Sequence, residues 1–408
     1  MARSEIQLKN PENQGKGFEQ LSAKHPEVGK AILKGSWNYI GHSNVDTVKT
    51  LNPLWMKNID TNVKNKLWKK CGSVRKTLVN FGKNKAIIAV GAGQSFNKNK
   101  DVLKRVSNKD GVRDWEYRDF IIIASNHQFK PLLDMGIIPD FVVLVDGSDV
   151  VYDQLTKDIP KEGQHSTLLA GLHCSPKVMS EWVRQKRELR FFLTTTKEVK
   201  EQFHKATGKM PYDHVIMQGG NVLNTALTMG LQVFDSRVFM AVGNDLSFPL
   251  EKDLDERRSS YYADGDYSSN ARGTGTGRDE ASSKFMWLGF NLKKKPGVEY
   301  VNYNSYDIEL DPVGVSRTLW VYKTWIESNM VLNSYKPEAQ KVHYYNCSEG
   351  GILGVMARKD DDESLNDINN WFMLDETCSY WHTAKLEDAV EQFYKAKDLL
   401  TWETKATV

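Results

Sequence analysis

Paired cysteines and long apolar runs are both missing from this chain. Its four cysteines, Cys71, Cys174, Cys347 and Cys378, are scattered, and none belongs to a CxxC pair. This spacing argues against a zinc site and for a reducing compartment, so we expect a cytoplasmic protein. No apolar run approaches the roughly 18 residues of a membrane span. The polar start, MARSEIQLKNPENQ, also leads us to expect no secretory signal.

Acidic residues are scarce in one segment, although the formal net charge of the whole chain is only +3. Between Ala31 and Lys109 there are 16 Lys and Arg residues against 3 Asp and Glu residues, a balance of +13. A basic segment of this size suits a phosphate-bearing partner: a nucleotide, a lipid head group or a nucleic acid. A solvated, lysine-rich surface that binds nothing is the alternative, and composition does not decide between the two.

Continuous apolar runs alternate with helical segments through the middle of the chain. The runs lie at residues 85–93, 119–126, 140–149, 165–174, 189–196 and 236–245. Unbroken Val, Ile, Leu and Phe residues are typical of parallel strands that are covered on both faces. The alternation therefore predicts an α/β fold with a doubly wound, mostly parallel, Rossmann-like sheet.

The segments on either side of this core have a different pattern. We expect residues 1–80 to form a basic helical region, with helices over 11–35 and 62–82. The Rossmann-like core is expected at 81–305, with the charged, Gly/Ser/Thr-rich stretch 251–280 as a lid or insertion loop. Residues 306–408 are expected to be a helical C-terminal region from about Asp307, interrupted at 343–354.

The first strand runs into a glycine turn, AVGAGQSF. Phe96 stands where a GxGxxG fingerprint needs its third glycine, and no GK[ST] follows, so the turn is neither a dinucleotide fingerprint nor a P-loop. We expect the N–H groups of Gly91, Gly93, Gln94 and Ser95 to face an anion at a helix start. A tight turn without a ligand is the alternative.

Polar residues also follow the ends of the later strands. Asn126, Asp146 and Asp245 each end a strand, and the segment 218–221 (Gln-Gly-Gly-Asn) opens a helix. In an open parallel sheet, ligands bind outside the carboxyl ends of the strands, so we expect all of these residues on one rim. Each of them could instead end a strand or cap a helix without binding anything.

Five motifs in this order resemble those of a known family. They are GAGQSF, SNHQFKPLLDMGIIPDFVVLVD, GGNVLNTALTMG, VGNDLSF and NCSEGGILG. Over roughly residues 81–250 and 343–354 they resemble the 6-hydroxymethylpterin diphosphokinase MptE-like family, which includes the Maf flagellin-modifying glycosyltransferases. More distantly, the chain is similar to bacterial lipooligosaccharide sialyltransferases. The family turn usually reads Gly-x-Gly-Pro-Ser-Leu, so this chain departs from it at Gln94 and Phe96.

The resemblance implies a role for each motif. It implies that the first turn and Asn126 bind the nucleotide, and that the 218–221 segment binds the transferred group. Asp146 and Asp245 are then the candidate catalytic residues, with Asp146 a candidate ligand of Mg²⁺ or Mn²⁺. The residues implied in donor binding are Gly91, Gly93, Gln94, Ser95, Asn126, Gln218, Gly219, Gly220, Asn221, Glu349, Gly350 and Gly351. None of His127, His173, His214 and His343 lies in a matching motif, so no base is assigned.

We therefore expect an enzyme, a glycosyltransferase with a nucleotide sugar as donor. An ATP-dependent diphosphokinase acting on a pterin-like hydroxymethyl group is the first alternative, and a non-catalytic nucleotide or nucleic-acid binding module is the second. On the glycosyltransferase hypothesis, Gly93→Val is expected to abolish donor binding while leaving the fold intact.

The acceptor is open, and a modified base in DNA is one candidate. Trp37, Tyr39, Trp55 and Trp68 lie within the basic segment, and lysines interleaved with aromatic residues suit a nucleic acid. A helical subdomain that these aromatic side chains merely pack is the alternative.

Overall fold

The computed structural model describes residues 36–107, 118–249, 284–294, 296–297, 306–334, 342–354 and 381–405. Nine strands within them form one sheet and three form another. The strands of the large sheet are β1 (Gly72–Ser73), β2 (Ala86–Val90), β3 (Phe120–Ser125), β4 (Phe141–Leu144), β5 (Thr167–Gly171), β6 (Leu189–Phe192), β7 (Val238–Val242), β11 (His343–Asn346) and β12 (Trp381–Thr383). The small sheet contains β8 (Phe248–Pro249), β9 (Lys284–Lys294) and β10 (Tyr306–Ser316).

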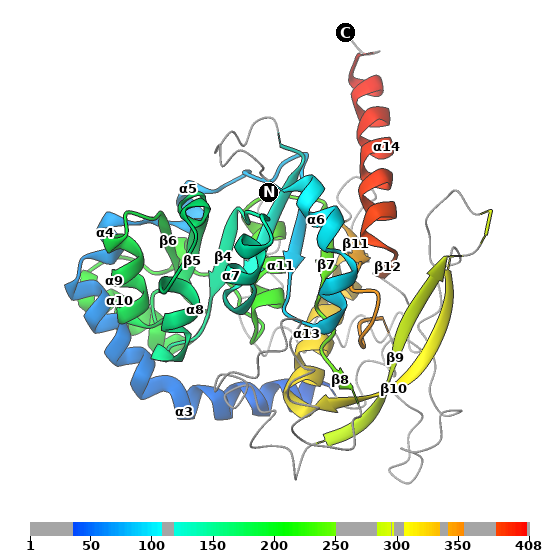
Figure 1. The fold of residues 1–408 in the computed structure, drawn as a ribbon. Coiled ribbons are helices and arrows are strands. Elements are labelled where there is room, and N and C mark those ends of the chain that lie inside the picture. Colours follow the sequence, from blue (N-terminus) through cyan, green and yellow to red (C-terminus); the bar gives the residue numbers. More distant parts are fainter. Residues whose placement is uncertain are drawn as a thin grey trace.

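The large sheet has the order β1-β6-β5-β4-β3-β2-β7-β11-β12, and every neighbouring pair is parallel (Figure 1). The small sheet is antiparallel, in the order β8-β10-β9. Helices connect the strands of the large sheet and cover both of its faces. The predicted doubly wound α/β fold is therefore confirmed.

The connecting helices alternate with the strands as the sequence pattern predicts. They are α3 (Ser36–Lys64), α4 (Leu67–Lys70), α5 (Val74–Thr77), α6 (Lys100–Val106), α7 (Asn126–Asp134), α8 (Tyr152–Thr156), α9 (Pro176–Arg184), α10 (Lys197–Thr207), α11 (Val222–Gln232), α13 (Arg317–Ser334) and α14 (Leu386–Lys405). Short 3₁₀ helices are η1 (Gln94–Lys98), η3 (Asp149–Val151), η4 (Lys161–His165) and η5 (Tyr212–His214).

Alternate side chains of each central strand enter two different cores. In β2, Ile87 and Ala89 pack in one core with Leu227 of α11. Ile88 of the same strand packs in the opposite core with Leu103 of α6. All of these side chains are buried, and burying a Leu or Ile side chain contributes about 1.5 to 3 kcal/mol. Burial on both faces explains why these strands have continuous apolar sequences.

The large sheet crosses both of the predicted domain boundaries. β1, before residue 81, pairs with β6, and β11 and β12, after residue 305, extend the sheet beyond β7. A core drawn at 81–305 therefore omits three strands of its own sheet. Whether these segments fold as separate units stays a prediction.

Two expected helices are wrong in part. The stretch 62–82 is not one helix: Lys66 adopts a left-handed φ of 60°, and the chain then enters β1 before α5. Residues from Asp307 to Ser316 form most of β10, and the helix begins only at Arg317. The expected helix at 11–35 and the expected lid at 251–280 lie outside the described residues.

The most specific motif of the family resemblance, GIIPDF, lies at the amino ends of the strands. Asp140 is buried there, where it forms an ion pair with Arg118 and accepts the N–H of Ile122 at 2.8 Å. Its own carbonyl accepts the N–H of Thr167 at 2.9 Å. The motif thus joins three neighbouring strands at the edge opposite the expected ligand rim.

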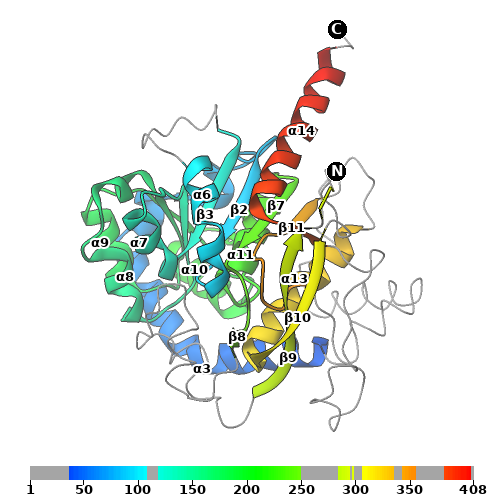
Figure 2. The ribbon, with the colours of Figure 1, turned by 45° about the vertical axis from the view of Figure 1, so that its right-hand side comes forward.

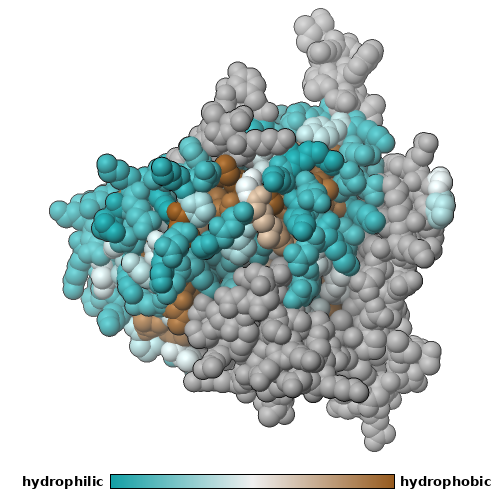
Figure 3. Space-filling view, viewed as in Figure 1, coloured by the Kyte–Doolittle hydropathy of each residue, from teal (hydrophilic) through white to brown (hydrophobic). Residues whose placement is uncertain are grey.

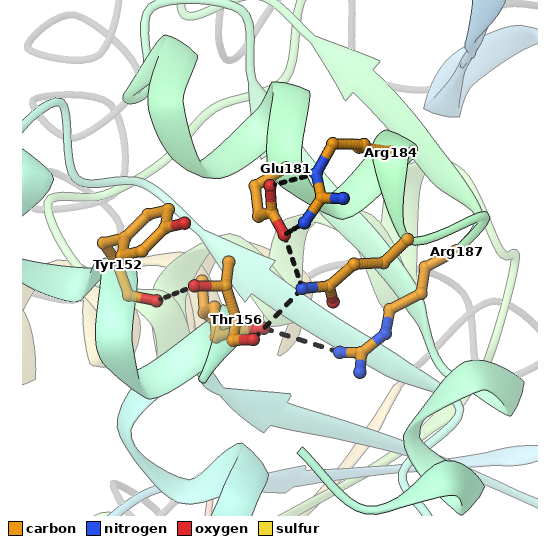
Figure 4. A network of polar contacts seen from close by, with 7 residues as sticks. Tyr152, Thr156, Glu181, Arg184 and Arg187 are labelled. Atoms are coloured by element: carbon orange, nitrogen blue, oxygen red, sulfur yellow. Dashed lines mark hydrogen bonds and ion pairs between the residues drawn. The ribbon is translucent and has the colours of Figure 1, made fainter. Parts of the chain in front are cut away.

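Figure 4 shows a second polar network at that amino edge, where α8 and α9 end. The Gln185 side-chain amide donates to the Thr156 carbonyl at 3.1 Å and to Glu181 at 2.7 Å. Arg184 binds the same carboxylate through two bonds of 2.7 and 2.6 Å. Since Arg184 is three-quarters exposed, this pair contributes little to stability. The network links the ends of α8 and α9 at the edge of the sheet opposite the expected ligand rim.

The described surface is mostly polar. On the face drawn in Figure 3, hydrophobic side chains show only as small separate areas. Figures 1 and 2 both show α14 extending away from the body and the β9–β10 hairpin lying near α13. Among the described helices, none has the length and apolar character needed to cross a membrane.

Candidate functional site

Most of the predicted site residues follow the carboxyl ends of strands, where the sheet has a topological switch point, and the 218–221 segment lies at the start of α11 beside the loop after β5. From β2 the chain adds β3, β4, β5 and β6 on one side, and then returns to add β7 on the other side. Ligands of doubly wound folds bind outside the carboxyl ends at such a reversal. The structure divides the predicted residues into two groups, one at β2, β7 and β11 and the other at β4, β5 and the start of α11.

The first group is centred on Asp245. Its buried carboxylate accepts the N–H of Ser95 at 3.0 Å and also the Ser95 hydroxyl. Burial raises the pKa of Asp245, although the two bonds from Ser95 and the charge of Lys98 oppose this shift. Asp245 is therefore a buried acceptor that joins the loop after β7 to the turn after β2.

The two glycines of the first turn allow this close approach. A Cβ on Gly91 would lie 2.4 Å from the carbonyl oxygen of Gly243, and one on Gly93 would lie 2.7 Å from Cγ of Asp245. Their N–H groups donate to Val242 and to Gly243, each at 2.8 Å. Glycine is required here because two loops of the protein pack together, whether or not a ligand binds.

The EGG motif packs against the same loop from β11. A Cβ on Gly351 would lie 2.3 Å from the Asp245 carbonyl oxygen, and Gly351 has a φ of +85°. Glu349, also at positive φ (56°), is buried, and burial raises its pKa against the charges of Lys385 and Lys98. Its carbonyl accepts Lys98 Nζ at 2.7 Å. Gly350 lies between these two residues.

These bonds change the interpretation of the first turn. The N–H groups of Gly91, Gly93 and Ser95 all donate to protein acceptors, so these three do not form the expected anion cradle. Gln94 begins η1 at the same turn. A donor-binding role for these residues stays a prediction, but the contacts that the structure shows are between loops of the protein.

The second group surrounds the start of α11. Gly219 and Gly220 adopt left-handed φ values of +57° and +88°, a conformation that favours glycine. Asn221 caps the helix, since its side-chain oxygen accepts the N–H of Asn224 at 2.8 Å. The Asn224 side chain in turn donates to the Gly219 carbonyl at 2.6 Å. Asn224 thus holds the turn through the Gly219 carbonyl and the Asn221 side-chain oxygen.

The N–H groups of this second turn are not used by the protein. In the part of the chain that the structure describes, the N–H groups of Gly219, Gly220, Val222 and Leu223 have no protein acceptor. Unsatisfied N–H groups and the helix dipole together make a helix start favourable for an anion. This turn is the better candidate for a phosphate of the donor.

His173 lies beside the second turn, at the end of β5. Its ring is fully buried, its Nδ1 has no partner among the described residues, and its Nε2 is 3.5 Å from Nε2 of Gln218. Trp55 packs edge-on against it, with ring centroids 5.1 Å apart. Burial lowers the pKa of His173 to about 4, partly opposed by the backbone of Val145. The imidazole is therefore neutral near pH 7.

Asp146 and Tyr322 complete this group. Asp146 follows β4, is exposed, and accepts the N–H of Ser148 at 2.8 Å. The Tyr322 ring, from α13, lies against Gly220, where an added Cβ would be 2.6 Å from the ring. Burial, and secondly the charge of Asp146, raise the pKa of Tyr322 to about 12. The phenol stays protonated, so it can donate a hydrogen bond at this turn.

Asn126 lies between the two groups, at the end of β3. Its side-chain amide donates to Gln154 Oε1 at 2.9 Å, and Gln154 also contacts His127 at 3.2 Å. It is partly buried and begins α7. The structure thus places it on the rim, with a protein partner for its amide group.

Metal binding fits only one mode here. Among the described residues, no three His, Cys, Asp or Glu side chains come together as metal ligands do. Mg²⁺ is often held by one or two carboxylates together with the phosphates of its substrate. Asp146, beside the second turn, fits that mode, and the metal stays a prediction.

The aromatic residues of the basic segment give the nucleic-acid acceptor no support. Trp55 is buried against His173, and Trp68 packs edge-on against Phe203 at 6.2 Å. The Trp55 indole is therefore not available to stack on a base, and Trp68 is partly buried in the same core. The side chains of Trp37 and Tyr39 lie outside the described part of the structure.

Residues 55–251 match the family described as 6-hydroxymethylpterin diphosphokinase MptE-like. The matched range is just under half of the chain, and it shows that this region is similar to that family. The predicted resemblance is confirmed over residues 81–250, and its second part, 343–354, lies outside the matched range. The matched range contains β1 to β8 with both glycine turns. No curated protein matches the chain. The chain is also similar to a solved MAf glycosyltransferase from Magnetospirillum magneticum AMB-1, at 15% identity with a TM-score of 0.42. That match covers 72% of this chain and 36% of the other protein.

Sequence reasoning missed several residues of the second group. The sequence led us to expect Trp55 either to stack on a base or to pack a helical subdomain, and it gave His173 no role. The position of His173 directly after a buried strand was the available sign. Tyr322 lies about a hundred residues after the turn, outside the range that matches the family and outside every motif.

Proposed function

We propose that this protein is a transferase that uses a nucleotide-activated donor, and that the donor is a nucleotide sugar. The observation that carries the proposal is the second turn, where a helix start with unused N–H groups faces a rim that also holds Asp146, His173 and Tyr322. The similarity of residues 55–251 to the MptE-like family supports a nucleotide phosphate as the group bound there.

In the proposed reaction the bond between the anomeric carbon and the donor's phosphate oxygen breaks. The electron pair stays on the leaving nucleotide, and the N–H groups at the start of α11 stabilise its negative charge. An acceptor hydroxyl attacks the anomeric carbon, and its proton passes to the Asp146 carboxylate, which acts as general base. The Tyr322 hydroxyl orients the sugar by hydrogen bonding, and the buried, neutral His173 supports the turn through Gln218.

A diphosphokinase is the second candidate, because the matching family carries that name. The same turn would then hold the phosphates of ATP, and Asp146 would hold a magnesium ion that neutralises their charge. The two reactions differ in the nucleotide bound.

A thermal-shift panel separates them. Saturation at 100 times the Kd stabilises a protein by about 2.7 kcal/mol, which is easily measured. The proposal predicts larger shifts with UDP, GDP, CMP or their sugar conjugates than with ATP and magnesium. A shift with ATP and magnesium alone would select the diphosphokinase. No shift with any nucleotide would contradict both enzymes and would also exclude a module that binds nucleotides.

If Asp146 is the general base, removing its carboxylate should lower the rate of transfer without weakening donor binding. Asp146→Asn should lower transfer from the identified donor by about 10²- to 10⁴-fold. Donor affinity should change by less than about threefold if no metal is needed, since the charge-stabilising groups are backbone N–H groups. Steady-state rates and donor titrations of the variant and the wild type measure both effects. Wild-type rates in the variant would remove Asp146 as the base.

A further inference from the structure

Helix α3 contacts the loops after β4 and β5 through one face. Trp55, Asn58 and Asn62 lie three and four residues apart, so their side chains share one side of the helix. All three are buried, with 7%, 4% and 0% of the residue exposed. Two buried amides on the inner face of a helix are unusual unless their hydrogen bonds are made.

Asn58 bridges the two loops with a single amide group. Its Nδ2 donates to the carbonyl oxygen of Gly147 at 2.8 Å and to that of His173 at 3.0 Å. Gly147 directly follows Asp146, so both bonds act within one residue of a proposed functional side chain. Trp55 closes the same contact, because a Cβ on Gly147 would lie 3.0 Å from Cδ1 of Trp55.

Asn62, one turn later, holds only the loop after β5. Its Nδ2 donates to Leu172 at 2.8 Å and to Cys174 at 3.0 Å, the two neighbours of His173. The carbonyls on either side of His173, and that of His173 itself, are therefore all fixed by α3. Asn65, the residue directly after α3, differs: its exposed side-chain amide donates to Ser180 at 3.3 Å and to no loop carbonyl among the described residues.

We propose that Asn58 is a positioning residue, which holds Asp146 and His173 in one mutual geometry at the α11 turn. The importance of that geometry rests on the proposed function, but the bridge itself does not. Without Asn58 the two carbonyls lose their shared donor, and the loops after β4 and β5 can move apart. Water then reaches the buried ring of His173.

The test compares Asn58→Ala with Asn65→Ala, by NMR on histidine-labelled protein. In the wild type the imidazole of His173 should stay neutral at pH 5.5, because it is buried. In Asn58→Ala the ring should be about half protonated or more at that pH, as expected for a solvated histidine. Asn65→Ala should match the wild type. Asn58→Ser, which keeps one donor, provides a milder variant should the alanine protein fail to fold.

Affinities for UDP, CMP and ADP give the functional readout. Whichever of the three binds the wild type should bind Asn58→Ala at least tenfold more weakly and Asn65→Ala equally well. A lower unfolding temperature with an unchanged His173 titration and unchanged affinity would overturn the proposal and make Asn58 merely structural. Failure of the wild type to bind any of the three would overturn the proposed function instead, and the titration would still decide whether the bridge exists.

Discussion

Two glycine turns lie at the carboxyl edge of the same sheet, one directly after β2 and one at the start of α11, and the protein uses them differently. In the turn at 91–95, the N–H groups of Gly91, Gly93 and Ser95 donate to the loop after β7. In the turn at 218–221, the glycine N–H groups have no acceptor within the described chain, and α11 begins directly behind them. The first turn joins the ends of β2 and β7, whereas the glycine N–H groups of the second turn are the ones that we propose bind the donor.

The difference teaches that a glycine turn after a strand does not by itself define an anion site. Glycine is needed in the first turn because backbone and a carboxylate come within 2.4 to 2.7 Å of the Cβ positions. It is needed in the second because φ is positive and the Tyr322 ring lies close. The two turns differ in whether their N–H groups donate to acceptors within the protein or have none there.

The largest expected effect comes from breaking the first turn. Asp245→Ala should lower the free energy of unfolding by about 4 kcal/mol, since it leaves the buried N–H and hydroxyl of Ser95 without an acceptor. Nucleotide affinity of the folded variant should stay within about threefold of the wild type. Urea unfolding and a nucleotide titration check both values.

A stable Asp245→Ala protein that no longer binds nucleotide would reverse the comparison and make the first turn a ligand site. Ser95→Ala serves as the matched variant, and it should cost less because the backbone bond to Asp245 remains. By the same reasoning Gly93→Val should destabilise the fold, which differs from the expectation based on sequence alone.

The second effect concerns His173 beside the second turn. Its pKa is about 4 in the folded protein, below the ordinary 6.5 of an unfolded chain. The unfolded state therefore takes up the proton first, and stability is full above pH 6.5 and falls as the pH drops toward 4. At 1.36 kcal/mol per pKa unit, this amounts to about 3 kcal/mol.

His173→Gln should remove that contribution to the pH dependence. Unfolding free energies of both proteins at pH 7, 5.5 and 4.5 isolate it, because every other titrating group is shared. Parallel curves for the two proteins would show that the ring is solvated and that the second turn is not built around a neutral histidine.

Much of this fold could be predicted from the sequence, because buried parallel strands have continuous apolar runs that are visible locally. The rim position of Asp146 followed from a strand end in the same way, whereas the 218–221 segment was recognised as a glycine pair that opens a helix. The prediction of one helix over 62–82 was wrong because the apolar spacing there resembles a helix. The strand β1 within it forms only by pairing with β6.

The hydrogen bonds between the first turn and the loop after β7 could not be predicted. Its acceptor, Asp245, is 150 residues away in the chain, and Ser95 looks the same in sequence whether it binds a phosphate or a carboxylate. Asn58 and Tyr322 were missed for a related reason. An amide inside a basic helix and a tyrosine outside every motif gain a role only when the fold brings them to the rim.

The smallest change tests the central claim most directly. Val222 is the first residue of α11, and the preceding Asn221 is extended, with φ −142° and ψ 176°. Proline is well tolerated at that helix position and after an extended residue, so Val222→Pro removes one N–H group with little effect on the fold. Lys197→Pro, at the first residue of α10, is the matched control.

Titration of both variants with UDP, GDP and CMP is the deciding measurement. Loss of one hydrogen bond to a charged phosphate is worth about 1.5 to 3 kcal/mol, so Val222→Pro should bind about 10- to 100-fold more weakly. Lys197→Pro should bind like the wild type, and both variants should unfold within a few degrees of it. Wild-type affinity in a folded Val222→Pro protein would contradict the assignment of the second turn as the phosphate site.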